Sequence, residues 1–216
     1  MRLIPLALVL CLAAPLHAAA VEGDVKVLGR RGYHKDLSDV VVYLEGAADG
    51  APGKARAEIR MARKRFEPRV AVVPVGTTVE FPNDDPILHN VFSVSGDNRF
   101  DLDLYKRPEV GRKTFESPGL VRVYCNIHPQ MSAFVLVTRG SHHTMADASG
   151  RFRLEGVPPG RYTLRAWHER AREEASVEIE VGAQGAAPVS LELDASKYRP
   201  ARHKNKYGKE YDKDRY

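Results

Sequence analysis

From residue 21 to residue 194 the chain repeats one pattern, in which a short run of β-branched or aromatic residues is followed by Gly, Pro, Asn or Asp. Runs of this length and composition predict strands, and many short strands at this spacing are typical of sandwiches and barrels. The clearest runs lie at 25–28, 40–44, 70–75, 77–81, 91–94, 121–124, 133–137, 152–154, 162–167, 177–181 and 189–193. We therefore predict an all-β protein.

Residues 1–20 have the composition of an export signal. Arg2 precedes an apolar run over 3–16, and Ala18 and Ala20 place small residues before a cleavage site at Val21. The apolar run is too short to span a bilayer, and no later stretch of the sequence reaches 18 uncharged apolar residues. We expect a signal peptide over 1–20, a periplasmic location and no membrane span.

The positive charge is concentrated at the C-terminus. The net charge is +5, and residues 197–216 hold eight Lys or Arg against three acidic residues, so residues 21–196 are close to neutral. A near-neutral body argues against nucleic acid as a partner. Residues 195–216 have few apolar side chains apart from four tyrosines. We expect a disordered basic tail, either solvated or docked on an acidic partner or an anionic surface.

One loop gathers three metal-capable side chains. Cys125, His128 and Met131 follow the run 121–124 at a C-x2-H-x2-M spacing, and His89 stands at the start of the strand expected at 91–94. Cys11 lies in the expected signal peptide, so Cys125 is the one cysteine of the exported chain. A lone cysteine in an oxidising compartment cannot form an intramolecular disulfide, so Cys125 is either an inert core residue or a ligand. Two imidazoles, a thiolate and a weak axial thioether make a blue-copper site. A methionine is a poor zinc ligand, which favours copper.

These residues resemble a known family. Together with that loop, the segments 66–68, 76–81, 83–84 and 89–91 are similar to the cupredoxins, particularly plastocyanin and amicyanin. The short loop is closer to that of amicyanin. The resemblance covers residues 55–138 and implies a Greek-key β-sandwich that holds one copper ion, cycling between Cu(I) and Cu(II).

The resemblance also implies a role for each residue of the site. His89, Cys125 and His128 would be the equatorial ligands, and Met131 the axial one. Asn90 would join the two ligand loops through its side chain and direct its backbone N–H at the sulfur. His128 would lie at the surface as the electron exit.

The C-terminal part resembles a second family. Residues 147–154 and 157–164, joined through Pro158-Pro159-Gly160, are similar to carboxypeptidase regulatory-like (transthyretin-like) domains. We expect Gly160 to adopt a positive φ, so that the two flanking strands pair. His142 and His143 are adjacent, and we interpret them as an exposed linker rather than as ligands. The default role of this module is structural or partner docking.

Such domains normally begin with two strands that residues 140–194 lack. We expect residues 21–46 to supply them, with the cupredoxin domain of 55–138 inserted between the two pieces. The alternative is a simple tandem, in which 21–46 packs on the cupredoxin domain.

Three functions follow from this organisation. The leading hypothesis is an exported one-electron carrier, and the alternatives are copper delivery or storage, and a structural module with a vestigial site. An enzyme is disfavoured, since the sequence has neither a His-x-His pair nor a second cysteine beside Cys125. Exported proteins that combine these two modules are often labelled methylamine-utilisation proteins. That resemblance implies a dehydrogenase donor and a cytochrome acceptor.

Overall fold

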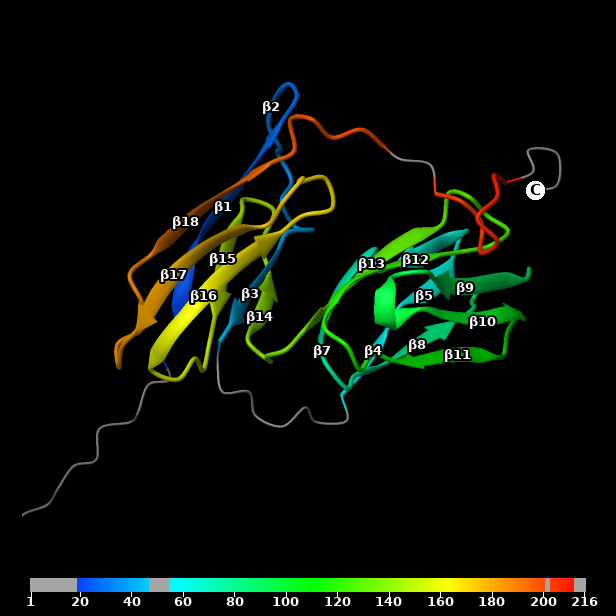
Figure 1. Ribbon diagram of the computed structural model, residues 1–216, viewed down its shortest axis with the longest axis horizontal. Helices are drawn as coiled ribbons and strands as arrows, with labels where there is room; N and C mark the ends of the chain where they lie inside the picture. Colours follow the sequence, from blue (N-terminus) through cyan, green and yellow to red (C-terminus); the bar gives the residue numbers. More distant parts are fainter. Residues whose placement is uncertain (1–18, 47–54, 201–202, 212–216) are drawn as a thin grey trace, which may run out of the picture.

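The computed structural model describes residues 19–46, 55–200 and 203–211, and it confirms the all-β prediction. Within these residues the only helix is the 3-10 turn η1 (Gly96–Asn98). The strands form two bodies that lie side by side (Figure 1). None of the helical structure in the described ranges is long and apolar enough to cross a membrane.

The first body is a sandwich of two sheets and a hairpin. One sheet has the order β10-β9-β12-β13-β7, the other has the order β11-β8-β4, and β5 pairs with β6. Apolar side chains between the sheets form a core that includes Cys125 and Met131. The strands are β4 (Arg56–Glu58), β5 (Arg60–Ala62), β6 (Arg65–Glu67), β7 (Val70–Pro74), β8 (Thr78–Pro82), β9 (His89–Ser93), β10 (Phe100–Tyr105), β11 (Val110–Thr114), β12 (Gly119–Tyr124) and β13 (Ser132–Thr138).

The second body joins the first two strands and β3, all before residue 46, to the strands that follow residue 140. Its sheets have the orders β15-β1-β18, with β2 paired to β1, and β14-β3-β16-β17. Both β1 and β3 therefore pair with strands that follow residue 140. The strands are β1 (Val21–Gly29), β2 (Gly32–Tyr33), β3 (Val41–Glu45), β14 (His143–Met145), β15 (Arg151–Leu154), β16 (Gly160–Trp167), β17 (Ala175–Val181) and β18 (Val189–Asp194).

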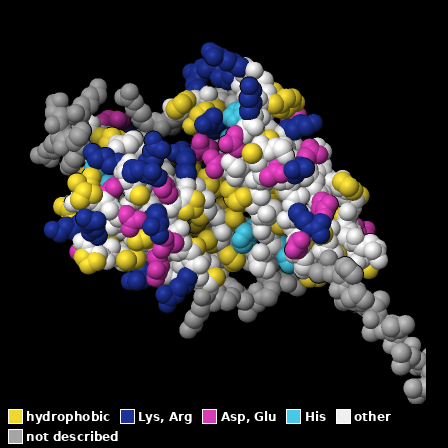
Figure 2. All heavy atoms as spheres, turned by 180° about the vertical axis from the view of Figure 1, so that it is seen from behind, with side chains coloured by type: hydrophobic (Ala, Val, Ile, Leu, Met, Phe, Trp, Pro, Cys, Tyr) yellow, Lys and Arg dark blue, Asp and Glu magenta, His cyan; other side chains and the backbone are white. Residues whose placement is uncertain are grey.

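An apolar cluster joins the two bodies. Val41 and Trp167 of the second body pack with Val70 and Leu136 of the first. The Trp167 and Phe134 rings lie 5.5 Å apart between centroids. Figure 2 shows apolar side chains gathered in the hollow between the bodies. Burial of this surface favours a fixed arrangement of the two bodies.

The Pro-Pro-Gly turn does not form the expected hairpin. β15 pairs with β1, whereas β16 pairs with β3 and β17, so the turn carries the chain from one sheet to the other. The positive φ occurs at Gly156 (70°) and not at Gly160. The reversal is thus made before the prolines, where a glycine tolerates the left-handed backbone.

The structure differs from the sequence analysis at two further points. β10 and β11 were not predicted, because their polar side chains interrupt the apolar pattern. His143 is not in an exposed linker: it is half-buried in β14, opposite Tyr43. Residues 1–18 of the predicted signal peptide lie outside the described residues. Ala19 and Ala20 contact the second body, since their carbonyls accept the N–H groups of Val157 and Ala186.

The basic tail is not disordered over residues 203–211, which we call the C-terminal strap. In Figure 1 the chain after β18 lies on the second body, whereas the strap lies on the first body, beside β9 and β12. The strap packs there through hydrogen bonds and ring stacking rather than through apolar burial. That is why a composition poor in apolar residues did not reveal it. Residues 201–202 and 212–216 of the tail lie outside the described residues.

Candidate metal centre

Two loops at one end of the first body bring three donor side chains together. His89 begins β9, and Cys125 directly follows β12. These strands neighbour each other in the sheet, with Tyr124 opposite Phe92. His128 lies in the turn between β12 and β13, where the Met131 N–H donates to the His128 carbonyl. The pairing of β9 with β12 therefore unites donors that are 36 residues apart in the chain.

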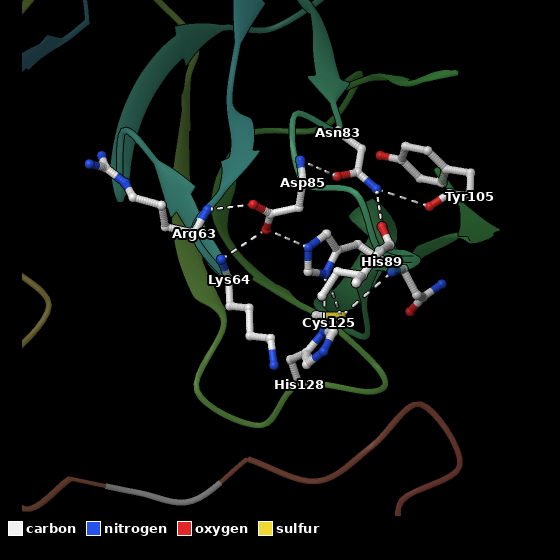
Figure 3. Close-up of polar contacts among 10 residues, drawn as sticks. Arg63, Lys64, Asn83, Asp85, His89, Tyr105, Cys125 and His128 are labelled. Carbon is white, nitrogen blue, oxygen red and sulfur yellow. Dashed lines mark hydrogen bonds and ion pairs between the residues drawn. The ribbon is translucent and has the colours of Figure 1, made fainter. Parts of the chain in front are cut away.

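The three donor atoms form a compact, buried cluster (Figure 3). Nδ1 of His89 lies 3.0 Å from Nδ1 of His128. The Cys125 sulfur lies 3.6 Å from Nδ1 of His128 and 4.0 Å from Nδ1 of His89. All three atoms lie within 4.8 Å of one another, and His89 and Cys125 are fully buried. Such a cluster can hold a metal ion.

The protonation of the donors reflects their burial. Burial, followed by the charge of His89, lowers the pKa of His128 to about 4, so this ring is neutral at neutral pH. Burial also raises the pKa of the Cys125 thiol, although backbone N–H groups of Asn90, Ile127 and His128 oppose the shift. A metal ion would reverse that effect, because thiol coordination displaces the proton.

Met131 is buried beside this cluster. Its side chain is fully buried in the core cluster that contains Cys125. The Cys125 N–H donates to the Met131 carbonyl at 3.3 Å, which closes the loop between them. The fourth expected ligand thus lies on the same closed loop as Cys125 and His128.

Asn90 connects the two ligand loops. Its backbone N–H points to the Cys125 sulfur at 3.5 Å, and its side-chain oxygen accepts the N–H of Asn126 at 3.2 Å. Its side-chain NH₂ donates to Asp101 and to the Asp103 carbonyl. Both the oxygen and the NH₂ group of the Asn90 side chain are therefore hydrogen-bonded, which fixes the backbone N–H of Asn90 relative to the sulfur.

Asp85 is a residue of the candidate site that the sequence analysis missed. Its carboxylate lies 2.8 Å from Nε2 of His89 and also accepts the backbone N–H groups of Arg63 and Lys64. Burial opposes ionisation of Asp85, but these hydrogen bonds outweigh it and lower the pKa of the carboxyl. Asn83 holds the Asp85 loop in place by accepting the Asp85 N–H and donating to the carbonyls of Ile87 and Tyr105 (Figure 3).

The Arg63-Lys64 turn has a shape suited to this contact. Both residues have a φ of 54°, the left-handed pair expected in a two-residue hairpin turn between β5 and β6. The turn thereby presents two adjacent N–H groups to one carboxylate. An Asp four residues before a His would have been the only signal in the sequence, and in a loop that spacing fixes no geometry.

His128 does not lie at the surface as expected. The residue is 6% exposed. The strap lies against the same loop, where His203 Nε2 contacts the Pro129 carbonyl at 2.7 Å. The ring edge of His128 therefore does not face solvent, as the expected electron exit requires.

One family profile matches the C-terminal part of the chain. The family profile described as "Carboxypeptidase regulatory-like domain" matches residues 121–194, beginning inside β12. No curated protein is similar in sequence to this chain.

Several solved structures are similar to part of the chain. A novel purple cupredoxin from Nitrosopumilus maritimus is 26% identical over 38% of this chain and 99% of that chain, with a TM-score of 0.34. A Cu-containing nitrite reductase (NirK) from Thermus scotoductus SA-01 is 28% identical over 44% of this chain and 25% of that chain, with a TM-score of 0.38. A reduced amicyanin mutant is 22% identical over 45% of this chain and 98% of that chain, with a TM-score of 0.37. Each covers less than half of this chain, so the evidence for a metal centre is the geometry of the cluster itself.

Proposed function

We propose that this protein is a type 1 copper protein that carries one electron at a time. The observation that supports the proposal is the buried convergence of two imidazole nitrogens and one thiol, from His89, His128 and Cys125. This donor set fits copper, because Cu(I) favours soft sulfur and Cu(II) favours imidazole nitrogen. His89, Cys125 and His128 would hold the ion, with Met131 as a weak fourth ligand.

The surrounding residues support a carrier rather than a catalyst. When bound, copper supplies the one-electron couple. Asp85 orients His89, and Asn90 holds its N–H toward the sulfur of Cys125. Donors fixed in this way need little rearrangement when the charge of the centre changes, which favours fast electron transfer.

One observation favours copper delivery or storage as a second candidate. His128 is buried, so a partner cannot approach its ring edge directly. A shielded site suits retention of Cu(I).

We further propose export to the periplasm, on the composition of residues 1–20, and a redox partner protein that meets this end of the first body. A dehydrogenase donor and a cytochrome acceptor are the partners to test first.

The second body is proposed as a scaffold. Since β1 and β3 pair with strands after residue 140, we propose that 21–46 and 140–194 form one discontinuous domain into which residues 55–138 are inserted. A structural or docking role suits it, since the only cluster of three potential His, Cys or acidic ligands found in the described part of the chain is in the other body.

The test is the visible spectrum of the full protein loaded with Cu(II). A carrier gives an intense blue thiolate band that one reducing equivalent per protein abolishes and reoxidation restores. Cys125→Ser should remove the band, and His142→Asn, in the other body, should leave it intact. Tight Cu(I) binding without a band would favour delivery. Absence of both would leave only a structural module.

A further inference from the structure

The C-terminal strap is built into the support of the candidate metal centre. It reaches the loop that carries Cys125 and His128 at three points. The Tyr211 hydroxyl donates to the Cys125 carbonyl at 2.8 Å, the Lys206 N–H donates to Asn126 Oδ1 at 2.9 Å, and His203 Nε2 lies 2.7 Å from the Pro129 carbonyl. The His203 ring also stacks on Tyr124, with centroids 4.0 Å apart. The strap therefore follows the ligand loop on its outer side.

Lys206 closes a ring of four residues around that loop. Its backbone N–H binds the Asn126 side chain, and the Asn126 N–H binds Asn90. The Asn90 side chain donates to Asp101 at 2.7 Å, and the Asp101 carboxylate accepts a hydrogen bond from the Lys206 ammonium at 2.5 Å. Each member thus contacts two others. One of them, Asn90, also directs its backbone N–H at the Cys125 sulfur.

The charged pair in this ring is partly shielded from water. The Lys206 side chain is 19% exposed and the Asp101 side chain 35%. Burial opposes ionisation of Asp101, but the hydrogen bonds from Lys206 and Asn90 outweigh it and lower the pKa of the carboxyl. Hydrogen bonds between charged partners are stronger than neutral ones. The pair therefore binds the strap more firmly than an ordinary surface contact would.

We propose that Lys206 is a positioning residue of the metal centre. By closing the ring it fixes Asn126 and Asn90, and through Asn90 it fixes the hydrogen bond to the Cys125 sulfur. It touches none of the donor atoms. The proposal rests on the proposed function only in naming the centre that the ring serves, because the ring itself is formed by the protein alone.

The first experiment uses the metal-free full chain, so it does not depend on copper. Amide hydrogen exchange at Asn126, measured by NMR, reports the bond from its N–H to Asn90. Lys206→Met should accelerate this exchange about tenfold or more, and Lys206→Arg should restore much of the protection. Lys209→Met makes the same charge change at an exposed lysine of the strap and should have no effect. Unchanged exchange in Lys206→Met would overturn the proposal.

A double-mutant cycle distinguishes loss of the Lys206–Asp101 pair from detachment of the whole strap. Asp101→Asn removes the acceptor charge from the opposite side of the ring. The effects of Lys206→Met and Asp101→Asn on Asn126 exchange should be strongly non-additive, since each breaks the same link. Additive effects would mean that Lys206 acts elsewhere, and the proposal would be wrong.

A second readout separates this proposal from the proposed function. If the wild-type protein is blue with Cu(II), Lys206→Met should change the ratio of its visible bands and its reduction potential, because the hydrogen bond to the sulfur is altered. A blue protein whose spectrum and potential are the same in Lys206→Met would refute the positioning role and leave the carrier intact. The opposite outcome is also possible: the wild type stays colourless with Cu(II), yet its Asn126 amide is protected and Lys206→Met removes that protection. This result would refute the electron-carrier function and support the ring.

Discussion

The Asp85 carboxylate lies 2.8 Å from Nε2 of His89, on the side of the ring away from the cluster. A carboxylate only accepts hydrogen bonds, so Nε2 carries the proton and Nδ1 keeps its lone pair, which faces Cys125 and His128. One contact thus sets both the tautomer and the orientation of this histidine.

Asp85→Asn should therefore weaken the metal centre. An amide can present its NH₂ to His89 and lose the preference for the required tautomer, so we expect metal affinity to fall about 10- to 100-fold. Competition with a chromophoric Cu(I) chelator measures the change. Asp84→Asn, at a neighbouring exposed carboxylate that pairs with Arg60, is the control and should bind normally. Equal affinities in the two variants would mean that Asp85 does not orient the ligand.

Met131→Leu should show whether Met131 is a copper ligand or only a residue of the core. The substitution conserves volume, so the free energy of unfolding should fall by less than about 1.5 kcal/mol. If the thioether is the axial ligand, its loss raises the reduction potential of the copper-loaded protein, because one donor to the oxidised ion is removed. Met61→Leu changes an equally buried methionine of the same core and should leave the potential unchanged. A potential that moves equally in both variants, or in neither, would exclude Met131 as a ligand.

Trp167→Ala should uncouple the two bodies. Trp167 is 7% exposed and packs in the cluster that joins the two bodies. Its truncation should therefore lower the free energy of unfolding by about 3–5 kcal/mol. Calorimetry should then resolve two unfolding transitions in place of one. Tyr33→Ala, which truncates an aromatic residue that is 54% exposed, is the control. A single transition at nearly the original temperature would show that the cluster contributes little.

His168 should make the protein less stable in acid. Burial, then the charge of His34 and that of Arg170, lowers the pKa of His168 from 6.5 to about 4, against an opposing effect of Glu169. Between these values the unfolded state binds a proton that the folded state does not, so stability falls as the pH drops, by at most about 1.4 kcal/mol per pH unit. Denaturant titrations from pH 7 to pH 4 should show a shallower loss in His168→Gln. The same change at His142 is the control, and an equal slope in both variants would contradict the assignment.

Much of the candidate site could be predicted because it lies within short stretches of chain. The strand over 121–124 and the spacing of Cys125, His128 and Met131 placed three donors on one loop without any tertiary information. The partner His89 was a candidate from its place at the start of an expected strand, and the resemblance supplied its role as a ligand. Asp85 could not be found, since its contact depends on how the loop after β8 meets the β5–β6 turn.

The sequence by itself determined that this chain forms strands and that one loop carries sulfur and nitrogen donors, because both properties depend on neighbouring residues. Only the tertiary structure decided that His128 is buried and that the strap binds the ligand loop through Lys206, His203 and Tyr211. These contacts join residues about eighty positions apart through polar groups. Hydrogen bonds of that kind leave no hydrophobic period in the sequence, and a composition poor in apolar residues then resembles disorder.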